Sequence, residues 1–138
     1  MKCLTVCQPW AWAIAAGHKL VENRRKRTAH RGPLLIHAGT SRRFLEGESR
    51  EDWISRYGVA WPDESDLVFS CAVAIVRVSG CVLAAEVDSP WAFGPWCWIL
   101  EDVQPIDPIP IRGKPGLFNV PDEFIRDPAK WLLGPHVN

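Results

Sequence analysis

The sequence lacks the cysteine patterns of disulfide-rich and zinc-binding proteins. The sequence has five cysteines, an odd number. No two of them form a CxxC pair, and most lie within apolar runs. This pattern argues against a disulfide framework and is typical of buried free thiols. No cysteine and histidine have the spacing of zinc ligands, so we expect no metal site. Free thiols favour a reducing, cytoplasmic location.

Long apolar runs are absent as well. The longest apolar stretch, residues 71–87, contains Arg77 and Glu86. A membrane-spanning helix needs about 20 nearly uncharged residues, which this stretch does not provide. The first seven residues are too short for a secretory signal. We therefore expect no association with a membrane.

The formal net charge is zero, so the overall basic charge of many nucleic-acid-binding domains is missing. The charge is nevertheless uneven. Residues 1–56 hold eleven Lys or Arg against five Asp or Glu, a balance of +6. Residues 57–138 hold five against eleven, a balance of −6. This asymmetry predicts one basic face on an otherwise neutral protein.

The length of 138 residues predicts a single domain, with a core from about residue 3 to 120 and a tail over 121–138. Eight tryptophans are more than such a core needs, so we expect one or two of them to line a ligand site. The sequence has no internal repeat, no phosphate-binding glycine loop, no dinucleotide fingerprint and no Ser/His/Asp arrangement. We expect no cofactor.

The hydrophobic pattern predicts about six short strands and two or three helices, an α+β arrangement in which helices cap a barrel. Prolines 105, 108 and 110 predict an extended edge segment, because proline cannot serve a central ladder. The tail is predicted to hold one helical turn. Strands are predicted near residues 3–7, 19–24, 34–38, 71–87, 96–100 and 117–120, and helices near 9–17 and 49–58.

The first helix carries two tryptophans that point in different directions. Pro9 suits its beginning and Gly17 its end. Trp10 shares an apolar face with Ile14 and is interpreted as a core residue. Trp12 lies off that face and is the better candidate for stacking on a base. In the second helix, Trp53, Ile54 and Tyr57 are predicted to form an apolar stripe.

Four sequence blocks, in order, resemble the ASCH domain, the activating signal cointegrator homology region. The first is CLTVCQPWAWAIAAGHKLVENR, in which a strand, Gln-Pro-Trp-Ala, a helix and Gly-x-Lys-x-x-Glu-x-Arg follow one another. The others are HRGPLLIHAG, SPWAFGPWCWILEDVQPI and IRGKPGLFNV. The resemblance runs from Cys3 to Val120.

The resemblance implies a PUA-like β-barrel with a cleft beside the first helix. Relatives of this fold bind RNA, modified bases or DNA. We therefore expect a module that binds RNA or another single-stranded nucleic acid, or a modified nucleoside, as its partner. A protein-interaction domain that kept the barrel and lost the ligand is a further alternative, because fold alone does not determine function.

The resemblance also implies an enzymatic alternative in the same cleft. Some bacterial members are similar to amidohydrolases that cleave N4-acetylcytidine, and others have ribonuclease activity. In the hydrolase branch the residue matching Lys19 is catalytic, and a threonine nucleophile stands where this chain has Glu22. A carboxylate cannot replace that hydroxyl without changing the chemistry. Lys19 and Glu22 are the catalytic candidates if the protein is an enzyme.

The candidate ligand-binding residues combine cations for phosphate groups, indoles for stacking and polar side chains for base edges. Several have structural alternatives. In a regular strand Lys19 and Glu22 face opposite sides, and Glu22 can pair with Arg24. His37 can be a satisfied structural residue, and Ser41 can cap a helix. The complete set is Gln8, Trp12, Lys19, Glu22, Arg24, Arg25, His37, Ser41 and Trp91.

Overall fold

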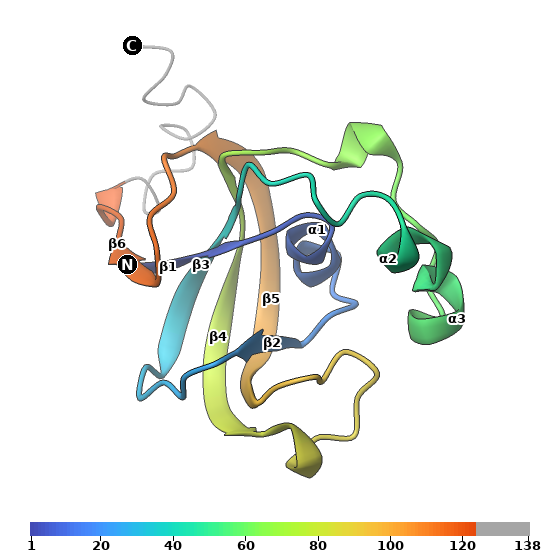
Figure 1. Ribbon diagram of the computed structural model, residues 1–138. Coiled ribbons are helices and arrows are strands. Elements are labelled where there is room, and N and C mark those ends of the chain that lie inside the picture. Colours follow the sequence, from blue (N-terminus) through green and yellow to red (C-terminus); the bar gives the residue numbers. More distant parts are fainter. Residues whose placement is uncertain (124–138) are drawn as a thin grey trace.

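The computed structural model describes residues 1–123, apart from the side chains of residues 48 and 49. One curled, six-stranded sheet with the order β2-β5-β4-β3-β1-β6 forms the body of the protein (Figure 1). Its strands are β1 (Lys2–Val6), β2 (Val21–Arg24), β3 (Gly32–Ala38), β4 (Cys71–Leu83), β5 (Trp96–Pro110) and β6 (Leu117–Asn119). The predicted helical turn in the tail lies outside the described residues.

The sheet is mixed, and its two longest strands differ from the prediction: β4 ends at Leu83, short of residue 87, whereas β5 extends beyond residue 100 to Pro110. β1 pairs with β3 in parallel, and the other pairs are antiparallel. β4 continues through Gly80, where the register with β5 shifts as at a bulge. β5 joins the predicted strand at 96–100 to the proline segment. β2 pairs with β5 only at residues 96–99, so the prolines lie where β4 is the sole neighbour.

The short helix α1 (Trp10–Ala15) connects β1 to β2 and lies inside the curl of the sheet (Figure 1). Ala11 and Ile14 are buried in the main core together with apolar side chains of β3 and β4. A second core on the other face of the sheet contains Cys3, Leu35 and Phe118. α1 therefore fills the interior of the curl. The first residue of the helix, Trp10, lines the pocket that is described below.

Two further helices cover one side of this interior, α2 (Glu48–Glu51) and α3 (Trp53–Tyr57), and 3-10 turns follow at η1 (Glu64–Asp66) and η2 (Ala84–Glu86). The predicted apolar stripe of α3 is only partly right. Trp53 is buried and Tyr57 is half-buried, but Ile54 is 64% exposed. Positions i and i+4 share a helical face, whereas position i+1 is turned about 100° away from it.

Within residues 1–123, no helix combines the length and the apolar character that crossing a membrane requires. The five cysteines are all free thiols, of which Cys3 and Cys97 are buried. Burial raises the pKa of the Cys3 thiol to about 12.

Candidate functional site

Lys19 does not lie in a strand, contrary to the sequence prediction. β2 begins at Val21, so the alternation of a regular strand does not apply to the preceding lysine. The Lys19 side chain folds back, and its Nζ donates to the Val21 carbonyl and, at 2.8 Å, to Oε1 of Glu22. The predicted placement of Lys19 and Glu22 on opposite faces is therefore wrong, and the two side chains form a direct ion pair.

Glu22 is held between two cations. Its Oε1 accepts from Lys19, and its Oε2 accepts from Nε of Arg24 at 2.9 Å. Lys19 and Glu22 are 3% and 6% exposed, whereas the Arg24 side chain is 30% exposed. Buried charges persist only when paired and hydrogen-bonded, and here each charge has such a partner. We call these three residues the charged triad.

Arg24 also connects two strands that are not neighbours in the sheet. Its Nη2 donates to the Thr5 carbonyl of β1 at 2.7 Å, although β5, β4 and β3 separate β2 from β1 in the sheet order. One guanidinium therefore spans the opening of the curled sheet while it holds Glu22. This fork geometry is particular to arginine, because a lysine ammonium cannot present donors in two fixed directions in this way.

A pocket of about 510 Å³ opens beside this bridge, within the size range of small-molecule sites. The charged triad forms its polar part, and the end of β1 contributes backbone and Cys7. Four aromatic side chains form a wall. The lining residues are Thr5, Val6, Cys7, Trp10, Lys19, Glu22, Asn23, Arg24, Phe44, Asp52, Arg56, Tyr57 and Phe93.

The aromatic wall is supported by rings behind it. Trp10 makes edge contacts with Phe44 and Tyr57, with centroids 6.4 and 5.7 Å apart. Tyr57 stacks flat on the buried Trp91, with centroids 3.8 Å apart and planes 1° apart. Burial raises the pKa of the Tyr57 hydroxyl, with Arg56 nearby acting in the opposite direction. Tyr57 therefore presents a neutral phenol to the pocket at physiological pH.

Asn23 fixes the loop that carries the last wall residue. Its Oδ1 accepts from the backbone N–H groups of Phe93 and Gly94, both at 2.8 Å, and its Nδ2 donates to the Trp91 carbonyl at 2.9 Å. Phe93 is 56% exposed and stands at the mouth, where Arg56 lies over its ring at 5.8 Å from the centroid. A single amide thus holds this loop against β2.

Only three of the predicted binding residues line the pocket, namely Lys19, Glu22 and Arg24. Gln8 is buried instead: its Oε1 accepts from the Trp12 backbone at 2.9 Å and its Nε2 donates to the Val68 carbonyl at 2.8 Å. This side chain links the start of α1 to the segment before β4. Its hydrogen bonds are structural.

The interpretation of Trp10 as a core residue is partly right, because it packs against two buried clusters while it also lines the pocket. Trp10, interpreted as core, is half-buried and lines the pocket. Trp12, predicted to stack on a ligand, is half-buried outside the pocket against Trp53 and His18. Both indoles contact Trp53 of α3, with centroids 5.2 Å apart for Trp10 and 6.4 Å apart for Trp12, but only Trp10 reaches the pocket lining.

The other predicted residues lie outside the pocket lining. His37 is buried; Thr5 Oγ1 bonds to its Nδ1 at 3.1 Å, and its Nε2 donates to the Ile111 carbonyl. Burial lowers the pKa of His37, which favours the neutral ring. Ser41 accepts from the Arg43 backbone. Trp91 lies behind Tyr57, and Arg25 is exposed beyond the end of β2.

Sequence reasoning missed most of the pocket lining, including Cys7 and the wall residues Phe44, Tyr57 and Phe93. One signal was present for Phe44, an aromatic residue that directly follows two arginines in a mostly polar segment. Tyr57 carried no such signal, because its helical spacing from Trp53 is also that of a core residue. Within residues 1–123, no group of three or more His, Cys, Asp or Glu is placed to hold a metal ion.

Solved structures with the same arrangement of elements support this architecture. ASCH from Zymomonas mobilis has a TM-score of 0.58 at 15% identity, covering 91% of this chain and 90% of that one. A tyrosine-to-phenylalanine mutant of that protein has a TM-score of 0.57 at 14% identity, covering 91% and 93%. At this identity the likeness shows the α+β fold, a curled six-stranded sheet with helices.

Among curated proteins, no relative matches this chain. The family comparison is more informative, because the ASCH domain matches residues 4–110, which include β2 to β5, most of β1 and all residues that line the pocket. The resemblance to this family is thereby confirmed, although the fourth sequence block lies beyond the matched residues, and the chain belongs to the ASCH domain family.

Proposed function

We propose that the pocket binds one base of a single-stranded RNA, including a modified base, with its sugar at the mouth. The observation that carries this proposal is the combination of an aromatic wall and a buried charged triad in one pocket of about 510 Å³. An apolar wall with a few convergent polar groups is the usual form of a site for a flat organic ligand.

The wall supports stacking on a base. Trp10 and Tyr57 already have ring partners behind them, so their orientations are held before a ligand arrives. A preorganised wall lowers the entropy cost of binding. Stacking of one base on an aromatic side chain contributes about 1–3 kcal/mol.

The triad supports hydrogen bonds to the edge of the base. Among the described residues, Lys19 Nζ donates to Val21 and Glu22, which leaves one of its three N–H groups for a carbonyl of the ligand. The Glu22 carboxylate has lone pairs beyond those that Lys19 and Arg24 occupy, and these can accept from an amino group. Donor and acceptor thus lie side by side.

The test is a fluorescence titration with matched single-stranded RNA, single-stranded DNA and duplex. We expect tryptophan quenching by the single strands and weaker quenching by the duplex, whose bases are already paired. Lys19→Ala should weaken binding roughly tenfold, the effect of losing about 1.4 kcal/mol. The absence of quenching by every oligonucleotide at low salt would overturn the proposal.

A matched pair of variants identifies the responding indole. Trp10→Phe removes a pocket residue, whereas Trp12→Phe removes an indole of the same helix that lies outside the pocket. The proposal requires the quenching amplitude to fall with Trp10→Phe and to persist with Trp12→Phe. Equal loss in both variants would indicate a general change in the protein instead.

Hydrolysis in the same pocket is the second candidate function, and the direct contact between Lys19 and Glu22 favours it. An ammonium beside a carboxylate is a possible acid–base pair. The position of Glu22 between two cations counts against it as a nucleophile or base, because bond formation at the carboxylate would weaken both ion pairs. Incubation with N4-acetylcytidine, followed by chromatography, tests this: an unchanged substrate peak excludes the amidohydrolase.

A further inference from the structure

Exposed cations flank the pocket mouth on two sides. On one side the chain runs from the pocket residue Arg24 directly into Arg25 and Lys26, both exposed. On the other side Arg42 and Arg43 are exposed and directly precede the wall residue Phe44. We call Arg25, Lys26, Arg42 and Arg43 the basic rim.

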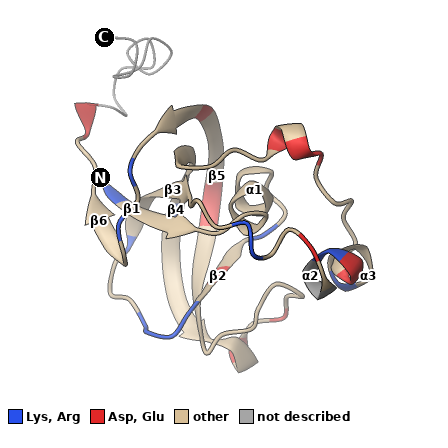
Figure 2. Ribbon diagram, turned by 45° about the horizontal axis from the view of Figure 1, so that its top comes forward, with Lys and Arg blue, Asp and Glu red and all other residues tan. Residues whose placement is uncertain are grey.

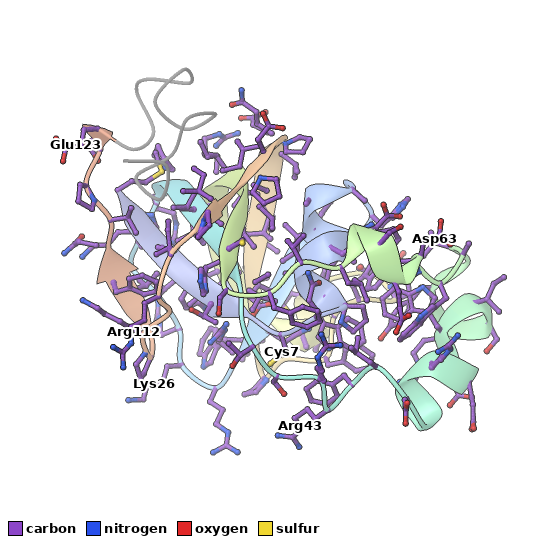
Figure 3. The ribbon with its side chains drawn as sticks, turned by 90° about the horizontal axis from the view of Figure 1, so that it is seen from above. Cys7, Lys26, Arg43, Asp63, Arg112 and Glu123 are labelled. Carbon is purple, nitrogen blue, oxygen red and sulfur yellow. The ribbon has the colours of Figure 1, made fainter. Side chains whose placement is uncertain are left out.

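The views of the molecule agree with this arrangement. Figure 2 shows basic residues in the loop that follows β2 and in the segment between β3 and α2. In Figure 3, Lys26 and Arg43 lie on the same side as Cys7, which lines the pocket, whereas Asp63 and Glu123 lie elsewhere. One residue of each basic segment thus lies on the side of the molecule that carries the pocket residue Cys7.

The charges of the rim are available to a ligand. Among the side chains that the structure describes, which do not include those of residues 48 and 49, no carboxylate forms a salt bridge with any of the four rim cations, in contrast to Arg24, Arg56 and Arg77. Arg42 lies over the Phe69 ring at 4.2 Å, and Arg43 lies over the Phe44 ring at 4.8 Å, both measured to the centroid. Ring contacts hold the guanidinium groups in place without neutralising them.

The backbone on the β2 side is also held. The Lys26 carbonyl accepts from the indole N–H of Trp98 at 3.2 Å, and Arg27 lies over the Trp96 ring at 5.2 Å. Arg25 and Lys26 thus project from a segment fixed to β5. The first pair of cations is thus presented by anchored backbone and the second pair is held by ring contacts, and both arrangements suit contact with phosphates.

We propose that the bound base belongs to an internal nucleotide of a single strand, and that the basic rim contacts backbone phosphates on both sides of it. This inference rests on the proposed function and specifies its ligand. A free nucleoside carries no phosphate and would leave all four rim cations without a partner. Two basic segments, one directly after the pocket residue Arg24 and one directly before the pocket residue Phe44, match a strand that continues past the pocket in both directions.

The test compares a nucleoside, a single nucleotide and a short oligonucleotide with the same central base, each titrated over a range of salt concentrations. The oligonucleotide should bind most tightly and lose affinity as salt rises, whereas nucleoside binding should hardly depend on salt. Each of Lys26→Ala and Arg43→Ala should reduce the salt slope for the oligonucleotide by roughly 0.7, and the double variant by about twice that.

The matched control is Arg77→Ala, which removes one exposed cation that is already paired with Asp102 and Glu101. It should leave the oligonucleotide slope unchanged. Nucleoside binding should be equal in all variants, because none of the substituted residues lines the pocket.

The outcomes separate this inference from the proposed function. If nucleoside and oligonucleotide bind equally and the rim variants change nothing, the rim proposal is overturned while the pocket proposal stands. If only one of the two single variants lowers the slope, the strand passes on one side and the two-sided proposal is overturned. If neither ligand binds, the proposed function itself fails.

Discussion

Glu22 is the residue on which the polar part of the pocket depends. It joins Lys19 and Arg24, and through Arg24 it joins β2 to the Thr5 carbonyl of β1. The two cations would otherwise face each other in a largely buried place. The carboxylate is therefore needed for stability whatever ligand the pocket takes.

Replacing this carboxylate should cost stability. Glu22→Ala leaves a buried lysine without its partner, and removal of one member of a buried ion pair costs roughly 3–5 kcal/mol. The free energy of unfolding from urea titration measures this loss. Glu46→Ala, at an exposed position, should stay within about 0.5 kcal/mol of the wild type. Similar small changes in both variants would contradict a stabilising role of the triad.

His37 should make the stability depend on pH in a defined direction. Burial lowers its pKa in the folded state, and its polar neighbours are the Thr5 hydroxyl and the Ile111 carbonyl. Below the ordinary histidine pKa of about 6.5 the unfolded chain takes up the proton more readily than the folded one. The stability is thus fully present above about pH 6.5 and falls as pH decreases below that value.

The measurement is the free energy of unfolding from pH 8 to 5.5, for the wild type and for His37→Gln. The variant is expected to be less stable at pH 8, because it loses the ring contacts, and to show a smaller fall toward pH 5.5. Carboxylates titrate mostly below this window, so they contribute little to the difference. Parallel curves for the two proteins would exclude His37 as the cause.

At the level of elements, the loop after η2 depends on β2 for its position. The Asn23 side chain accepts two backbone hydrogen bonds from this loop and donates one to it. Gly94 in the same loop has a φ of +77°, and a Cβ there would lie 2.7 Å from that of Ala84. Both the positive φ and the lack of room for a Cβ therefore favour glycine at position 94, and this turn thereby fixes the position of the neighbouring Phe93.

Asn23→Ala should release this loop. The loss of several partly buried hydrogen bonds, at about 0.5–1.5 kcal/mol each, should destabilise the protein by roughly 1.5–4 kcal/mol. Asn23→Asp keeps an acceptor for the Phe93 and Gly94 N–H groups and should cost less. Amide hydrogen exchange of Phe93 and Gly94 reports the change directly. Unchanged protection in Asn23→Ala would show that the rest of the loop holds itself in place.

At the scale of the whole molecule, the curl of the sheet separates the five thiols into two classes. Cys3 and Cys97 are fully buried, and Cys7, Cys71 and Cys81 are half-buried. Burial raises the pKa of the Cys3, Cys71 and Cys97 thiols, which further slows their reaction with disulfide reagents because the thiolate is the reactive form.

A thiol titration without reductant should show this division. The native protein is expected to react quickly at fewer than five cysteines, with Cys3 and Cys97 unreactive at pH 8. The unfolded protein should react at all five. Because Cys7 lines the pocket, a bound oligonucleotide should slow its labelling and leave that of Cys81 unchanged. Five fast thiols in the native protein would contradict the burial described above.

The sequence by itself determined the family, the approximate strands and the choice of Lys19, Glu22 and Arg24 as site residues. These properties are local: the three residues belong to one short motif, Gly-x-Lys-x-x-Glu-x-Arg, and the proline pattern marks the edge half of β5. The pairing of Lys19 with Glu22 was not predicted, because strand alternation was extended to a residue that precedes β2.

Only the tertiary structure decided which side chains share the pocket. Trp10 lines the pocket and Trp12 does not, although both indoles contact Trp53 of α3, and Phe44, Tyr57 and Phe93 come from three separate segments. The role of His37 likewise depends on Ile111, 74 residues away. Such contacts depend on how the sheet curls, and no local periodicity encodes which distant segments the curl brings together.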